Sequence, residues 1–123
     1  MADSNYWFKL DTQLVTDDDY DIVLVFADSA GNGVDISAWT FYYHCKSLDS
    51  SNSDTITVAD GSMSKSNSGS GVTDTVTIPL AQAATDAMAK GKYLQEIKVV
   101  KNSKNYTIAR GTIKFADKVV TIT

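Results

Sequence analysis

The chain has very little of the residue types on which most site chemistry depends. Its 123 residues include one cysteine (Cys45), one histidine (His44), one proline (Pro79) and one glutamate (Glu96). A single cysteine excludes an intramolecular disulfide, so the fold must be held by its core alone. A single histidine excludes metal sites that are built from several histidines. We therefore expect neither a cofactor nor a bound metal.

The sequence also lacks the short motifs of common enzyme classes. It contains no Walker loop, no G-x-S-x-G elbow and no G-x-G-x-x-G fingerprint. A hydrolase would depend on His44 or Glu96. His44 is adjacent to Cys45, and neighbours in a strand point to opposite faces, so the two side chains cannot form a Cys-His pair. The alternation around Glu96 directs it away from Tyr93 and Ile97. We predict that the chain is not an enzyme.

An acidic run at residues 17–21 resembles a calcium loop in its spacing. Asp17, Asp19 and Asp21 alternate, but the sixth position is Ile22, where glycine is required, and the twelfth is Asp28, where glutamate is expected. The run also continues directly into a predicted strand. We interpret it as a charged turn, and weak cation binding by this cluster together with Asp28 is the alternative.

The balance of charge argues against polyanionic and membrane partners. Fifteen acidic and eleven basic residues give a net charge of -4. Along the sequence the basic residues are scattered singly or in pairs, which predicts no contact with nucleic acid. The polar N-terminus has no secretory signal, and the apolar runs are far shorter than the roughly twenty residues that cross a bilayer. We expect synthesis in a cytoplasm and no contact with a membrane.

Apolar and polar residues alternate along most of the chain, which is the pattern of strands with one buried face. The clearest pair is Asp19–Ala27 and Trp39–Lys46, separated by the Gly-rich turn at residues 28–33. Further strands are predicted at residues 6–15, 56–58, 75–78, 93–99, 106–115 and 119–122. Seven to nine strands in one domain, residues 1–123, predict an all-β antiparallel sandwich.

Three segments depart from the strand pattern. The Ala-rich segment at about residues 80–89 has helical spacing, and Gly91 is a natural stop for a short helix. Residues 64–71 are mainly serine, glycine and asparagine, which predicts a mobile loop. Residues 1–5 are polar and are predicted to be a flexible N-terminus. Pro79 is predicted to end the preceding strand.

The best candidates for partner contacts are side chains on the outer faces of the strands. If Phe41 and Tyr43 point into the core, Tyr42 and His44 point out. Trp7 is expected opposite the face shared by its neighbours, and aromatics of this kind either stack on sugars and partner surfaces or cover a second buried face. Cys45 is expected to be a core residue. Ser66 and Asn67 complete the predicted contact set, because they lie in the predicted loop.

Val23 and Val25 make their strand apolar on both faces. They lie in the phase opposite Tyr20 and Ile22. This pattern predicts either a covering loop or a protein interface on that side of the sheet.

The order of these signals resembles the Ig-like domains of tailed-bacteriophage structural proteins, typified by the N-terminal domain of the baseplate upper protein. The resemblance extends over about residues 16–123. It is carried by Asp19–Phe26, the segment 28–41, Val76–Leu80, the Ala-rich helix, Gly91–Val99 and Arg110–Phe115. It implies an Ig-like sandwich in a virion component without catalysis. Family members often continue into a receptor-binding or coiled-coil region that this sequence does not include, so the position on the particle stays open.

The resemblance therefore implies a structural protein of the virion, an assembly or attachment module on the particle exterior, with the tail or baseplate favoured. The expected partners are other virion proteins and further copies of the chain in a symmetric oligomer. A capsid decoration protein is one alternative. A carbohydrate-binding module that attaches the virion to cell-surface glycans is another, and it predicts exposed, coplanar aromatics beside acids or amides.

Overall fold

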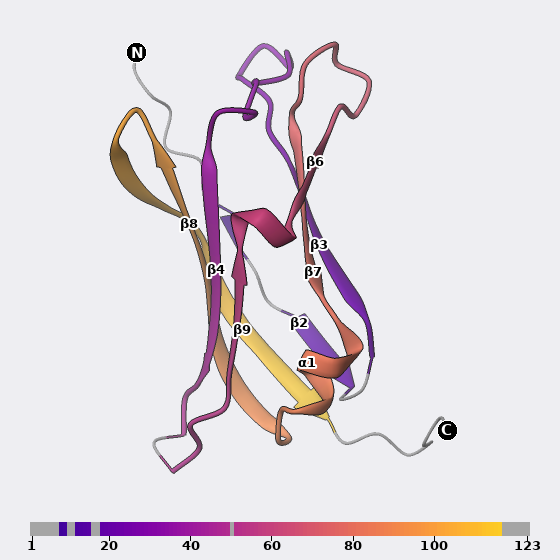
Figure 1. Cartoon of the computed structure of the whole chain (residues 1–123), viewed down its shortest axis with the longest axis vertical. Coiled ribbons are helices and arrows are strands. Elements are labelled where there is room, and N and C mark those ends of the chain that lie inside the picture. The colour runs from indigo at the N-terminus through magenta and orange to yellow at the C-terminus, as the bar shows by residue number, and fades with distance from the viewer. Residues whose placement is uncertain (1–7, 10–11, 16–17, 50, 117–123) are drawn as a thin grey trace.

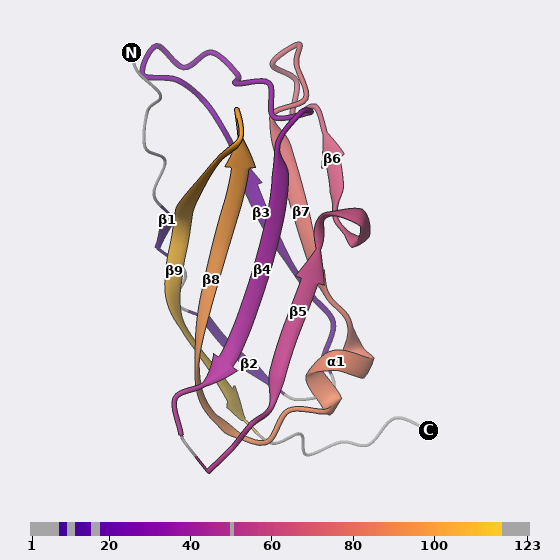
Figure 2. The same ribbon diagram turned by 60° about the vertical axis from the view of Figure 1, so that its left-hand side comes forward.

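The computed structural model describes residues 8–9, 12–15, 18–49 and 51–116, and these form two β-sheets packed face to face (Figures 1 and 2). In chain order the elements are β1 (Phe8–Lys9), β2 (Thr12–Val15), β3 (Tyr20–Val25), β4 (Thr40–Ser47), β5 (Thr55–Ala59), the 3-10 turn η1 (Asp60–Ser62), β6 (Ser64–Ser66), β7 (Thr75–Leu80), α1 (Gln82–Asp86), β8 (Gly91–Lys101) and β9 (Lys104–Ala116). The prediction of an all-β sandwich with one short helix is confirmed.

The larger sheet has the strand order β1-β9-β8-β4-β5, and β2 also pairs with β9. Strands β1 and β2 run parallel to β9, whereas the other pairs in this sheet are antiparallel. The smaller sheet has the order β3-β7-β6 and is antiparallel throughout. Strands β4 and β8 have a neighbour on both sides, so the middle of the larger sheet is a continuous surface (Figure 2).

The core lies between the two sheets and takes every second residue from most strands. Phe41, Tyr43 and Cys45 of β4 point inward, and the residues between them point out. The Phe26 ring lies with its centroid 5.9 Å from Phe41 and 5.4 Å from Trp39. The largest fully buried side chains are Tyr43, Tyr93, Phe26, Phe41, Phe115, Ile36, Ile78, Leu80, Ile97, Ile113, Gln95 and Val76. Burial of this apolar surface is the main driving force for the fold.

A bulge in β9 changes which of its residues face the core. Ile97 pairs with Ala109 but Lys98 pairs with Thr107, so Ile108 is an extra residue on β9. Both Ile108 and Ala109 are buried as a result. The bulge reverses the alternation, and the exposed Arg110 points to the outer face instead of the core.

The segment around Pro79 and the helix both differ in extent from the prediction. Strand β7 does not end at Pro79 but continues to Leu80, with Pro79 opposite Asp21 of β3. Strand β6 pairs only with Thr75–Thr77, so at Pro79 strand β7 has a neighbour on one side only. Proline has no N–H to donate, and it is tolerated at such an edge position because one side of the strand needs no hydrogen bond. The helix covers only Gln82–Asp86, because the next amides bond to carbonyls three residues back and tighten the last turn.

The loop predicted for residues 64–71 is in part a strand, and that part of the prediction is wrong. Ser64–Ser66 form β6, and its inward side chain is Lys65, whose ammonium lies 3.3 Å from Asp60 and 5.5 Å from the centroid of the Phe41 ring. The composition was misleading because a short edge strand needs few apolar residues, and here a lysine stem covers the core. The mobility of residues 67–71 stays a prediction, and residues 1–5 and 119–122 lie outside the described residues.

The carboxylate of Asp74 organises the remainder of this loop. It accepts hydrogen bonds from the backbone N–H of Ser68 (2.9 Å) and from the hydroxyls of Ser68 (2.6 Å), Ser70 (2.8 Å) and Thr75 (2.8 Å). The hydrogen bonds from Ser68 are the main reason why the pKa of Asp74 lies well below its usual range. Gly33 allows Ser70 to lie close to the 28–33 turn, because a Cβ at this position would collide with the Ser70 side chain.

A hydrogen bond between two side chains lies inside the core. The Tyr43 hydroxyl donates to Oε1 of Gln95 at 2.8 Å, and both residues are fully buried. Tyr43→Phe removes the hydroxyl and leaves the buried Oε1 of Gln95 without this donor. We therefore expect the variant to lower the free energy of unfolding by about 1–3 kcal/mol, the usual cost of removing one partner of a buried hydrogen bond. Urea denaturation would measure it, with Tyr42→Phe on the exposed face as the control. Equal stability of the two variants would contradict the expectation.

Candidate functional site

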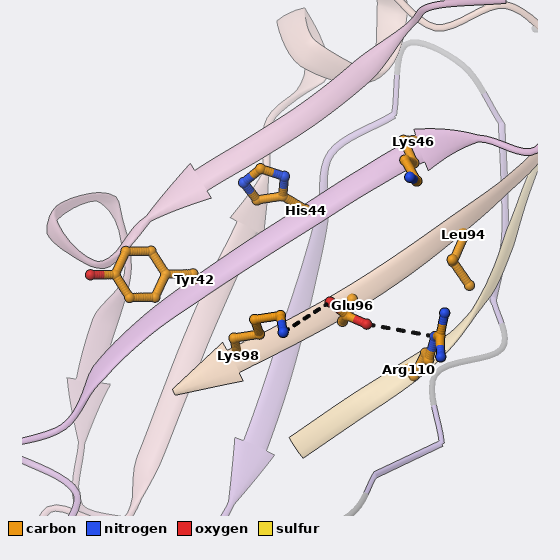
Figure 3. Close-up of a pocket in the computed structure, with 7 residues that line it drawn as sticks. All are labelled: Tyr42, His44, Lys46, Leu94, Glu96, Lys98 and Arg110. Atoms are coloured by element: carbon orange, nitrogen blue, oxygen red, sulfur yellow. Dashed lines mark ion pairs between the residues drawn. The ribbon is translucent and has the colours of Figure 1, made fainter. Parts of the chain in front are cut away.

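A shallow groove lies on the outer face of the larger sheet, over β4, β8 and β9 (Figure 3). It has a volume of about 500 Å³. The side chains that line it all point away from the core, and they are Tyr42, His44 and Lys46 from β4, Leu94, Glu96 and Lys98 from β8, and Arg110 from β9. The inward residues of the same strands are core residues, so the alternation that builds the core also builds the groove.

The strand register places the groove residues opposite one another in rows. Tyr42 faces Lys98, His44 faces Glu96, and Lys46 faces Leu94 across β4 and β8. Glu96 in turn faces Arg110 across β8 and β9. Side chains directly opposite each other have Cβ atoms about 4.5–5.5 Å apart, within reach of one ligand.

Glu96 lies at the centre of a group of basic side chains. Its carboxylate is 3.8 Å from the Lys98 ammonium and 3.6 Å from Nε of Arg110. Lys98 and Arg110 are more than half exposed, so each ion pair contributes at most about 1 kcal/mol to stability. Within the described part of the chain Lys46 has no ion-pair partner. The groove thus contains three basic side chains and one acidic side chain, and it is positively charged.

The excess of basic residues extends beyond the groove. Lys92 and Lys114 are also exposed, and they face each other across β8 and β9 in the same outward phase as Glu96 and Lys98. The basic residues are scattered along the sequence, but the fold gathers five of them on one sheet face: Lys46, Lys92, Lys98, Arg110 and Lys114. Residues far apart along the chain are brought onto one sheet face because their strands are neighbours.

The structure separates the predicted contact residues. Tyr42 and His44 lie together in the groove, and the exposed fraction of Tyr42 is 45%. Ser66 lies in β6 of the other sheet, and the Asn67 side chain accepts hydrogen bonds from Gly69 N at 2.8 Å and Gly71 N at 3.3 Å, which shape their own turn. Trp7 lies outside the described residues.

Sequence reasoning missed most of the groove. Lys46, Leu94, Lys98 and Arg110 were not among the predicted contact residues. The sequence did contain a signal that could have been used. Among the alternate residues of the segments 92–98 and 110–114 that belong to the polar face, basic residues outnumber acidic ones. The register between strands is a long-range property, and the bulge at Ile108 cannot be placed from periodicity alone.

The remaining candidates of the sequence have structural roles. Cys45 is buried as predicted, and burial raises the pKa of its thiol to about 11, so it is protonated at neutral pH. In the acidic run, Asp19 accepts a hydrogen bond from Gln82 N at 2.6 Å, and Asp17 lies outside the described residues. Asp28 accepts from the backbone of its own turn. Among the residues that the structure describes, no three acids, histidines or cysteines form a group that would hold a metal.

A second exposed apolar feature lies on the smaller sheet. Val23 and Val25 of β3 point outward with exposed fractions of 55% and 48%, opposite Thr77 and Thr75 of β7. Both side chains are exposed within the described part of the chain, and an interface on this face stays a prediction.

Comparisons with known proteins give only distant structural similarities. No protein-family model and no curated protein matches the chain. Among solved structures, it is similar to part of a family 123 glycoside hydrolase from Clostridium perfringens, with 11% sequence identity and a TM-score of 0.47, over 90% of this chain and 23% of that chain. It is also similar to part of InlP from Listeria monocytogenes, with 12% identity and a TM-score of 0.42, over 88% of this chain and 26% of that chain. Neither similarity supports a conclusion about function.

Within the described residues, no helix has both the length and the apolar character to span a membrane.

Proposed function

We propose that the chain is a non-enzymatic binding module of a virion, which acts through the outer face of its larger sheet. The bacteriophage role comes from the resemblance of the sequence to Ig-like structural domains. The observation that supports a binding role is the groove over β4, β8 and β9, where an exposed aromatic and several cations lie on a rigid, continuous sheet. Sheet faces of this kind offer contact area at little cost in conformational entropy.

The arrangement of His44 and Glu96 favours binding over catalysis. The two residues face each other across β4 and β8, which the sequence did not predict, but they lie on an open face instead of in a dry cleft. The carboxylate of Glu96 forms ion pairs with Lys98 and Arg110.

The proposal is tested in purified particles of the phage that encodes the chain. We expect mass spectrometry to find the protein in the particles in many copies, and a density map to place those copies on a symmetry axis or ring on the exterior. Presence in the lysate but absence from the particles would overturn the virion role. Hydrolysis of a glycan by the wild type that is lost in Glu96→Gln would overturn the non-enzymatic role.

A second candidate is a carbohydrate-binding module. The observation in its favour is that Tyr42, an exposed aromatic, lies in a groove with His44 and Glu96, which can hydrogen-bond sugar hydroxyls. Only one aromatic of the described residues lines the groove, so a platform of two coplanar rings is not present there.

A further inference from the structure

The charge of the groove is opposite to that of the protein as a whole. The chain has a net charge of -4, yet the outward positions of β4, β8 and β9 hold Lys46, Lys92, Lys98, Arg110 and Lys114 against the single acid Glu96. Screening limits the field of a surface charge to about 8 Å at physiological ionic strength. A ligand in contact with this face therefore experiences its positive potential. A polyanion farther away than this screening length does not.

From this charge and from the lining residues we infer that the groove binds an anionic oligosaccharide. The inference rests on the proposed role of this sheet face as the binding surface, and it names the ligand class. The anionic group, a carboxylate, sulfate or phosphate on a sugar ring, would lie against Lys46 and Arg110. Arg110 offers a planar fork of donors for such a group, and Lys46 offers a charge that no acid of the described residues neutralises.

The remaining lining residues match the rest of a sugar. The exposed ring of Tyr42 provides a flat apolar surface for the C–H face of a pyranose, next to Lys98 in the same row. His44 and Glu96 in the next row can exchange hydrogen bonds with hydroxyls. The volume of about 500 Å³ lies within the usual range of 300–1,000 Å³ for small-ligand sites.

Two other occupants fit the geometry less well. A peptide that recognises a sheet usually adds a strand to an edge, but β4 and β8 are central strands, so their backbone groups are already paired. A single-stranded nucleic acid usually stacks its bases on several aromatics, and only Tyr42 is available in the groove. The carboxylate of Glu96 would also lie close to the phosphates of a nucleic acid and repel them.

Lys46→Glu is the sharpest test, because Lys46 is exposed and has no ion pair within the described residues that the reversal of its charge would break. Binding of the wild type and the variant would be measured by calorimetry and on a glycan array. The array would carry polygalacturonate, sulfated and phosphorylated oligosaccharides, and the carboxyl-reduced form of polygalacturonate. We expect the wild type to bind at least one anionic class and not the reduced polymer, and Lys46→Glu to bind at least about tenfold more weakly.

Two further variants complete the design. Lys104→Glu makes the same change in charge at the exposed β8–β9 turn, outside the groove, and is expected to bind like the wild type. Tyr42→Ala is expected to bind about three- to tenfold more weakly and to keep the preference for anionic sugars, because it removes the stacking surface and leaves the cations. Circular dichroism and the denaturation midpoint would show that each variant is folded.

Several results would overturn the inference. It would be wrong if the neutral polymer bound equally well, or if Lys46→Glu and Lys104→Glu lost the same amount of affinity. It would also be wrong if single-stranded DNA bound more tightly than any glycan, or if no glycan bound.

The Lys46→Glu variant also separates this inference from the proposed function. If no glycan binds but phage carrying Lys46→Glu fail to incorporate the protein, the sheet face is a protein-binding surface and only the ligand class is wrong. If incorporation and glycan binding are both unchanged, the role of the face is wrong as well.

Discussion

Phe41→Ala is expected to lower the free energy of unfolding by about 3–5 kcal/mol. The Phe41 side chain is fully buried, and its ring centroid lies 5.9 Å from Phe26 and 6.2 Å from Trp39. Alanine would leave a cavity between the two sheets, and the Lys65 ammonium would lose the aromatic ring that it lies over. Because small domains have a total stability of about 5–15 kcal/mol, this loss is a large share of it. Urea denaturation followed by tryptophan fluorescence would measure the effect.

The neighbouring variant Tyr42→Ala is the matched control. It removes an aromatic of similar size from the next position of β4, but Tyr42 is 45% exposed and points to the opposite face. We expect a loss of less than about 1 kcal/mol, as for most surface substitutions. A larger loss in Tyr42→Ala than in Phe41→Ala would mean that the faces of β4 are reversed. The groove would then not exist, because the same alternation places Tyr42, His44 and Lys46 in it.

The alternation along single strands could be predicted from the sequence, because it depends on neighbouring residues only. Phe41, Tyr43 and Cys45 were expected in the core and Tyr42 and His44 on the surface, and the structure confirms all five. Composition was a poorer guide than periodicity. The serine-rich segment contains β6, because an edge strand with one inward lysine does not have the pattern of a typical strand.

The groove could not be predicted from the sequence, because it is a property of three strands together. Lys46, Lys98 and Arg110 are separated by many residues, and only the pairing of β4 with β8 and of β8 with β9 brings them together. The direction of Arg110 depends further on the bulge at Ile108. Sequence patterns therefore predicted the buried face of this sheet well, and they gave no prediction for the charge of its exposed face.

The stability of the loop between β6 and β7 is expected to depend on the ionised carboxylate of Asp74. The hydrogen bonds from Ser68, Ser70 and Thr75 favour the charged form, and they lower its pKa from the value of about 3.9 that an unfolded chain would have. A group whose pKa is lowered by folding contributes stability that is fully present above the unfolded pKa. This contribution is lost as the pH falls through the folded pKa.

Asp74→Asn is therefore expected to be less stable than the wild type at pH 7, and the difference is expected to shrink as the pH falls below about 4. The variant keeps the size of the side chain, but it has one carbonyl oxygen in place of two carboxylate oxygens that accept from four donors. Thermal unfolding of both proteins from pH 7 to pH 2 would measure this. Asp35→Asn, at an exposed turn where the Ser37 backbone lowers the pKa of Asp35, is the control and is expected to change the profile little. A constant difference between Asp74→Asn and the wild type at every pH would show that the charge of Asp74 does not stabilise the loop, and that its contribution comes from packing alone.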